Sequence, residues 1–165
     1  MKIELKTLTR TAILLGLTLA FQSLRLPQPV TGPIINAVLY TAAGIIGPIS
    51  GVIIGATTPW IAYAVGISRL APAVPVIMLG NISLVVVFAL LVRANKYVAA
   101  IAAAAAKWAV MSLGVKYIVA PQIPIPPPVY ASLTILQLWT ALGGAALSLL
   151  VMASLHAWQT KSHKA

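Results

Sequence analysis

The sequence predicts an all-α membrane protein, a single bundle of six transmembrane helices with both termini in the cytoplasm. The first observation behind this prediction is composition. Of the 165 residues, 61% are hydrophobic and 7% are charged, and the mean hydropathy is +1.01. A soluble domain is about 25% charged, so this composition excludes an ordinary water-soluble fold. A disordered chain is also excluded, because disorder requires low hydrophobicity.

The second observation is the spacing of the apolar stretches. A hydrocarbon core of about 30 Å requires about 20 helical residues. No small-x-small cleavage site follows the first stretch, so we interpret it as a retained helix rather than a signal peptide. Residues 26–68 carry no charge, and Gly47-Pro48 divides them into two short helices, because proline disfavours helical geometry in the residue before it.

The remaining helices are set by charges and prolines. Arg93 and Lys96 close the fourth stretch, and a proline-rich loop over residues 121–128 separates the fifth from the sixth. A run of prolines lacks backbone donors and favours an extended conformation. The expected spans within the single transmembrane domain 1–165 are residues 8–24, 33–46, 49–67, 72–92, 97–119 and 130–158.

The charged residues predict the orientation. Six crossings put both termini on one side, and cytoplasmic segments are enriched in Lys and Arg. Seven basic residues fall on the side of the termini and three on the other, so both termini are expected in the cytoplasm. Because the basic residues are scattered around the apolar stretches, no nucleic-acid partner is expected. The seven basic residues on the side of the termini are Lys2, Lys6, Arg10, Arg93, Lys96, Lys161 and Lys164, and the three on the other side are Arg25, Arg69 and Lys116.

Missing residue types exclude most kinds of chemistry. The sequence has no cysteine, and Glu4 is its only carboxylate, so thiol catalysis, paired-carboxylate catalysis and a proton-coupled carrier are all disfavoured. No glycine-rich loop ends in Lys-Ser or Lys-Thr, so the chain does not hydrolyse ATP by itself. His156 and His163 lie far from other metal-ligating residues. We expect no enzyme, no metal and no cofactor.

Polar residues within or beside the apolar stretches are the candidates for ligand binding. A lysine inside a membrane helix is costly unless it faces water, a partner or a ligand. The alternatives for Lys107 are that it binds a ligand, or that it snorkels or is neutral. Asn81 must hydrogen-bond either within the bundle or to a ligand. The candidate substrate-binding residues are Arg25, Asn36, Arg69, Asn81, Lys107 and Gln137.

Small residues form two further patterns. Ala12, Gly16 and Ala20 are spaced by four, which places them on one face of the first helix, where another helix can approach closely. Such faces commonly serve packing within the same bundle, and docking of a partner is the second possibility. The alanine-rich run over residues 99–106 is explained by tight internal packing.

In these features the chain resembles the S components of energy-coupling factor (ECF) vitamin transporters, which are the substrate-capturing membrane subunits. The likeness covers essentially the whole chain and includes the size and the six helices. The residues that carry it are Ala12, Gly16 and Ala20, the segment from Asn36 to Gly55 with its Gly47-Pro48 hairpin, Pro59, Gly66, and Asn81 after Pro75.

The resemblance implies an S-component-like bundle in the cell membrane of a prokaryote. Such a subunit binds a vitamin or vitamin precursor from outside and docks on a transmembrane coupling subunit driven by two ATPase subunits. The resemblance implies that Ala12, Gly16 and Ala20 contact the coupling subunit, with a glycine where the family has alanine. It also implies a site in the outer half, lidded by the loops after helices one, three and five, which points to the candidate residues above, to segment 25–31 and to the proline-rich loop.

The resemblance does not identify the ligand, although Lys107 and the basic outer loops favour a carboxylate or a phosphate. Two other classes of function stay open. A stand-alone facilitator or channel would pass its substrate without partners. An assembly or scaffold subunit would neither bind a ligand nor conduct one.

Overall fold

The computed structural model of the chain describes residues 4–162, and this part is helical with no β-strand. Of the residues discussed above, Lys2, His163 and Lys164 lie outside the described range. The helices are α1 (Leu5–Ser23), α2 (Gln28–Thr41), α3 (Pro48–Ala64), α4 (Val74–Leu91), α5 (Lys96–Gly114), α6 (Pro127–Leu133) and α7 (Ile135–Ser162). Short π-helical segments continue α2 (η1, Ala42–Ile46) and α5 (η3, Val115–Val119), and a 3₁₀ turn (η2, Ala71–Ala73) precedes α4.

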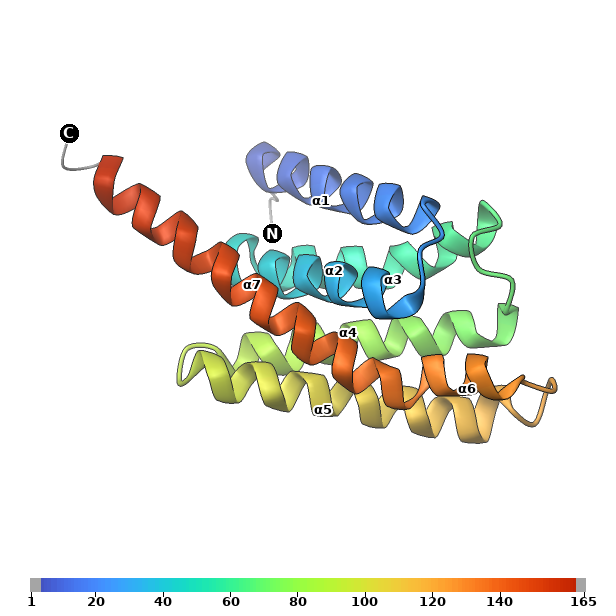
Figure 1. Cartoon of the computed structure of the whole chain (residues 1–165). Coiled ribbons are helices and arrows are strands. Elements are labelled where there is room, and N and C mark those ends of the chain that lie inside the picture. The colour runs from blue at the N-terminus through green and yellow to red at the C-terminus, as the bar shows by residue number, and fades with distance from the viewer. Residues whose placement is uncertain (1–3, 163–165) are drawn as a thin grey trace.

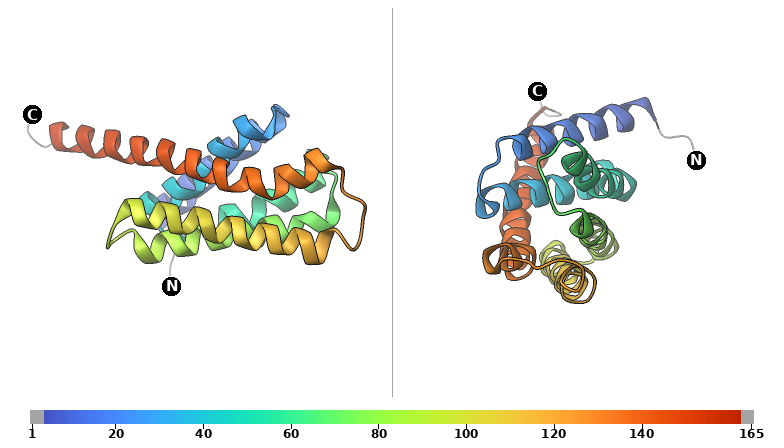
Figure 2. Two further views of the ribbon diagram at one scale, coloured as in Figure 1. Left: turned by 60° about the horizontal axis from the view of Figure 1, so that its bottom comes forward. Right: turned by 90° about the vertical axis from the view of Figure 1, so that its right-hand side faces the viewer.

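The long helices run back and forth along the bundle, and α7 crosses it diagonally (Figure 1). The most extensively packed pairs are α2 with α7, α4 with α5, and α3 with α4. Helix α1 packs on α3 and α2 and lies at the edge of the bundle in the end-on view of Figure 2. The start of α1, the end of α7 and the α4–α5 turn lie toward one end of the molecule, and the α1–α2 and α3–α4 connections lie at the other.

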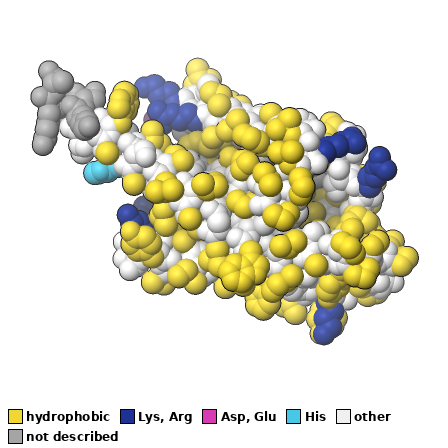
Figure 3. Space-filling model, in the orientation of Figure 1, with side chains coloured by type: hydrophobic (Ala, Val, Ile, Leu, Met, Phe, Trp, Pro, Cys, Tyr) yellow, Lys and Arg dark blue, Asp and Glu magenta, His cyan; other side chains and the backbone are white. Residues whose placement is uncertain are grey.

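Four helical segments within the described residues are long and apolar enough to cross a membrane. They are Gln28–Ile46, Ala71–Leu91, Lys96–Val119 and Ile135–Trp158. Helix α3 is not among them and has 17 residues, and neither is α1, which contains Lys6 and Arg10. In Figure 3, hydrophobic side chains cover the middle of the visible face, and Lys and Arg side chains lie toward its ends. The architecture is therefore compatible with a multi-pass membrane protein.

The second helix begins earlier than the sequence predicts. We expected residue 33 as its start, but α2 begins at Gln28 and contains Pro33. Pro29 is tolerated because it occupies the first turn, where a backbone N–H has no intrahelical acceptor in any case. The non-helical connection between α1 and α2 therefore ends at Pro27, which precedes the first helical residue.

The last helix differs in a similar way. A continuous helix over residues 130–158 was expected, but the chain forms α6 from Pro127 and α7 from Ile135, with Thr134 between them at φ −119° and ψ −94°. The expectation that the whole proline-rich segment stays non-helical is wrong at its end, because Pro127 and Pro128 begin α6, where proline is accepted. The break at Thr134 lies beside the cavity described below.

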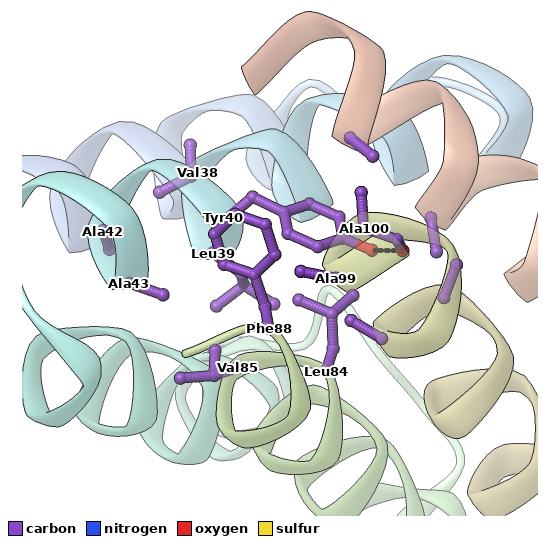
Figure 4. Close-up of a cluster of buried hydrophobic side chains, with 14 of the residues drawn as sticks. Val38, Leu39, Tyr40, Ala42, Ala43, Leu84, Val85, Phe88, Ala99 and Ala100 are labelled. Atoms are coloured by element: carbon purple, nitrogen blue, oxygen red, sulfur yellow. Dashed lines mark hydrogen bonds between the residues drawn. The ribbon is translucent and has the colours of Figure 1, made fainter. Parts of the chain in front are cut away.

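Two clusters of buried hydrophobic side chains form the core of the described residues. The larger one draws on α2, η1, α3, α4, α5 and α7 (Figure 4), and the second surrounds Met111 of α5. Tyr40 is fully buried, and its hydroxyl donates a hydrogen bond to the carbonyl oxygen of Ala100 at 3.0 Å. The Tyr40 ring packs edge-on against the ring of Phe88, with 4.9 Å between centroids. Four alanines of the run over residues 99–106 are buried in this core, which confirms internal packing as its role: Ala99, Ala100, Ala103 and Ala104.

The Gly47-Pro48 turn requires glycine for its backbone conformation. Gly47 has φ +134°, a region that residues with a side chain rarely adopt. We expect Gly47→Ala to destabilise the protein by about 1–3 kcal/mol, although the space around Gly47 is open. Thermal unfolding of the purified protein measures this. Gly16→Ala is the control, since Gly16 is helical and also has open space around it. Equal Tm values for the two variants would contradict the assigned backbone conformation.

Candidate functional site

A cavity of about 390 Å³ lies at the end of the bundle that carries the α1–α2 and α3–α4 connections. Side chains from each of the helices α1 to α7 and from the α1–α2 and α3–α4 connections line it. Its volume falls within the range typical of small-molecule sites, about 300–1,000 Å³. The apolar part of the lining is aliphatic, with Ile35, Ala62 and Ile77 as examples.

Lys107 is the centre of the polar part of this cavity. It lies on α5 and is 3% exposed. The Lys107 Nζ atom donates to Oδ1 of Asn36 on α2 at 2.6 Å and to Oδ1 of Asn81 on α4 at 2.8 Å. We call these three residues the Lys107 cluster. Because an ammonium can only donate, it turns both amide oxygens toward itself and leaves both amide NH₂ groups facing elsewhere.

A second layer of hydrogen bonds fixes the two asparagines. Asn81 Nδ2 donates to the carbonyl oxygen of Gly55 on α3 at 3.2 Å. Asn36 Nδ2 donates to Oγ1 of Thr140 on α7 at 3.4 Å. The cluster therefore ties α2, α3, α4, α5 and α7 together, so its geometry depends on how all five helices pack.

Two glycines allow this close approach of the helices. A Cβ atom at Gly144 on α7 would lie 2.5 Å from Cβ of Asn36 and 2.8 Å from the carbonyl oxygen of Pro33. A Cβ atom at Gly55 would lie 3.0 Å from Cβ of Asn81. Both asparagines thus occupy positions where the neighbouring helix has no side chain.

A protonated Lys107 has no acidic partner among the described residues. Glu4 is the only carboxylate of the sequence, and it precedes α1 at the opposite end of the bundle. A buried charge without a counter-ion is costly. The amide oxygens offset part of this cost through dipoles only, so the site retains an excess of positive potential.

The structure brings five of the six candidate substrate-binding residues to one cavity. Lys107, Asn36 and Asn81 form the cluster, Gln137 lies beside it, and Arg25 lies in the α1–α2 connection. The Gln137 side chain donates from Nε2 to the carbonyl oxygen of Ser132 at 2.8 Å, which spans the break between α6 and α7. Arg25 is exposed, and its Nη2 atom lies 3.5 Å from the carbonyl oxygen of Gly66, linking two connecting segments.

Arg69 and the proline-rich loop lie apart from the cavity lining. Arg69 is exposed, while its neighbours Ile67 and Ser68 line the cavity. The backbone N–H groups of Ile67 and Ser68 both donate to the carbonyl oxygen of Ala62, which holds this turn against the end of α3. Residues 121–126 do not line the cavity, but Ser132 and Leu133, which follow them, do.

Sequence reasoning did not single out several polar residues of the lining. They share an uncharged polar side chain, which a pattern of charges and apolar stretches does not single out. The buried Oε1 atom of Gln22 has no hydrogen-bond partner. Gln28, Thr31 and Ile35 are spaced by three and four residues, which places them on one face of α2. The residues are Gln22, Thr58, Ser68 and Ser132, whereas Gln28 and Thr31 belong to segment 25–31, to which the resemblance pointed.

The small-residue face of α1 points away from the bundle. Ala12, Gly16 and Ala20 are all exposed, and a Cβ atom at Gly16 would meet no other atom within 4 Å. Helix α1 instead buries Thr11 and Thr18, and Oγ1 of Thr11 donates to Oγ of Ser50 on α3 at 2.8 Å. Packing within the bundle therefore does not account for this face.

Comparison of the chain with protein-family models, with curated proteins and with solved structures finds no match in any of the three. The functional argument consequently rests on the cavity, on the Lys107 cluster and on the exposed face of α1.

Proposed function

We propose that the chain is the substrate-specific membrane subunit of an ECF-type ABC transporter. In this role it binds a vitamin or vitamin precursor from outside, and partner subunits drive uptake with ATP. The observation that carries the proposal is the cavity around Lys107, which is lined by polar side chains from each of the helices α1 to α7 and lies at one end of the bundle. The chain has no element of its own that would use ATP.

The packing beneath the cavity supports binding rather than conduction. Between the Lys107 cluster and the α4–α5 turn, the inward-facing residues of α2, α4 and α5 belong to the buried core. Tyr40, Leu84 and Ala103 are each less than 1% exposed. A ligand that enters the cavity therefore meets a closed floor, whereas the alternative of a stand-alone facilitator or channel requires a path through it.

The proposed topology has six crossings with both termini in the cytoplasm, in the cell membrane of a prokaryote. It requires α1 and α3 to cross together with the four longer segments. The positions of the basic residues support it, because Arg10, Arg93 and Lys96 lie toward one end of the bundle and Arg25 and Lys116 toward the other. The positive-inside rule then puts the cavity on the outer side.

The proposed partners are a transmembrane coupling subunit and two ATPase subunits, and the proposed contact is the face formed by Ala12, Gly16 and Ala20. Its exposure supports this contact, because side chains this small let a partner helix approach closely. Purification of the tagged protein from its native membranes in mild detergent, followed by mass spectrometry, tests the proposal. We expect a coupling membrane protein and two ATPases in the purified material.

A bulky residue on this face is expected to abolish recovery of the partners. We expect Gly16→Leu to reduce the recovered coupling subunit at least about tenfold, since a loss of about 1.4 kcal/mol already has this effect. Stability should not fall, because the space at Gly16 is open and leucine is the better helix former.

Ala105→Leu is the matched control, since Ala105 is an exposed residue of α5 away from the face. It should leave recovery at the wild-type level. Equal recovery from Gly16→Leu and Ala105→Leu would rule out this face as the contact. Absence of ATPases from the wild-type sample, under conditions in which a known S component retains them, would argue against the function itself.

A further inference from the structure

The Lys107 cluster has three N–H donors that are not used within the protein. The ammonium has three N–H donors and uses two, on Asn36 and Asn81. Each asparagine amide has two N–H donors and uses one, on Thr140 and Gly55. Each amide oxygen already accepts from Lys107 and has one further lone pair. Three N–H donors are left over, one of them on the ammonium, so the group of a ligand that fits this cluster best is one that accepts hydrogen bonds.

The charge of the cluster selects among the possible acceptors. One buried ammonium without an acidic partner is balanced by one negative charge, which a carboxylate supplies. A phosphate monoester carries about −1.5 to −2 charges at neutral pH, so it would leave a net negative charge buried among neutral amides. The other positive charge near the cavity, Arg25, is exposed at the mouth and donates toward Gly66. It is therefore placed to attract an anion rather than to neutralise a buried one.

The side chains that line the cavity indicate what kind of molecule carries the acceptor group. Within the described part of the chain, no Phe, Tyr or Trp side chain lines the cavity. Flat ring systems are commonly held by stacking on such side chains, and this wall offers aliphatic surface from Ile35, Ala62 and Ile77 together with hydroxyl and amide groups.

We propose that the cavity takes a small, non-aromatic monocarboxylate whose carboxylate accepts hydrogen bonds from Lys107, Asn36 and Asn81. The proposal rests on the binding role given above and specifies its substrate class. The body of the ligand lies along the aliphatic wall, and its hydroxyl or amide groups meet the polar side chains near the mouth.

Two measurements on the wild-type protein test this class. In the first, the compounds released from protein purified out of native membranes are identified by mass spectrometry. In the second, thermal stabilisation is measured with aliphatic hydroxy- and acetamido-carboxylates of four to ten carbons, each with its primary amide and its phosphate-ester analogue. Substituted benzoates and aliphatic amines complete the panel. Ligands that bind the native state raise Tm in proportion to the logarithm of their concentration over Kd.

We expect a released compound with one carboxylate, no phosphate and no aromatic ring. We also expect stabilisation by aliphatic carboxylates, with affinities at least about tenfold lower for the matching amides, because a charge-assisted hydrogen bond is lost. A released phosphate ester, amine or aromatic compound would overturn the proposal. So would a panel in which amides bind as well as carboxylates, or in which no carboxylate binds.

The outcome also separates this proposal from the broader function. If another class of compound binds and the coupling subunit is still recovered, the substrate class is wrong and the transport role stands. If carboxylates bind but no ATPase-driven partner is recovered, the substrate class stands and the transport role fails.

Discussion

Lys107→Met is expected to weaken ligand binding by about 100-fold or more. Methionine has similar length and fits the apolar surroundings, but it donates no hydrogen bond. Loss of the charge-assisted bond to the ligand, together with the misorientation of the two asparagines, is expected to cost about 3 kcal/mol. Isothermal titration with the tightest-binding carboxylate of the panel measures the change.

The control for this variant is Lys116→Met. Lys116 is exposed and lies nine residues further along the chain, in η3. The substitution is chemically identical, so an effect of net charge alone would appear in both variants. Wild-type affinity in Lys107→Met, with a normal elution profile and helical content, would show that the ligand does not lie on the Lys107 cluster.

Gly144→Ala is expected to lower the apparent Tm by roughly 10 °C and to abolish binding. The added methyl group would lie 2.5 Å from Cβ of Asn36 and 2.8 Å from two backbone atoms of α2. Backbone cannot move aside locally, so α2 and α7 must separate. Overpacking of this kind costs about 3 kcal/mol, and about 1 kcal/mol shifts Tm by roughly 3 °C in a protein of this size.

The neighbouring glycine provides a closely matched control. A Cβ atom at Gly143 would lie 3.5 Å from the Pro33 side chain, which is an ordinary van der Waals contact. Gly143→Ala should therefore leave Tm unchanged or raise it slightly. The higher helix propensity of alanine adds up to about 1 kcal/mol to the free energy of unfolding. If the two adjacent substitutions have the same effect, the register of α7 against α2 is wrong.

The centre of the site could be predicted from the sequence because burying polar and charged side chains in apolar helices costs free energy unless they have partners. A lysine and two asparagines within apolar stretches need partners wherever the helices place them. The residues that meet them could not be predicted in the same way. That Asn36 and Asn81 both accept from Lys107 depends on the packing of α2, α4 and α5, which no local pattern encodes.

The boundaries of the elements were less predictable for reasons that concern proline. Proline stops a helix when it lies inside but begins one when it lies in the first turn. Pro29, Pro127 and Pro128 occupy first turns, so α2 and α6 begin within segments that were expected to be loops. The break at Thr134 has no neighbouring proline or glycine that would mark it in the sequence.

The role of the small-residue face was open for a different reason. The spacing of Ala12, Gly16 and Ala20 places them on one face, but it does not say whether that face points inward or outward. The buried side of α1 is set by Thr11 and Thr18, which a hydropathy pattern does not distinguish from exposed threonines. Exposure of this face is what supports the proposal that it contacts a partner.

The most direct test of the central proposal is uptake by reconstituted vesicles. Vesicles containing this protein alone are compared with vesicles that also contain the captured coupling subunit and ATPases, using a radiolabelled carboxylate from the panel. We expect accumulation only when the partners and ATP are present, and we expect Lys107→Met to abolish it. Flux through the protein alone would instead establish a stand-alone facilitator, and the lack of ATP-dependent accumulation by the complete assembly would contradict the transport role.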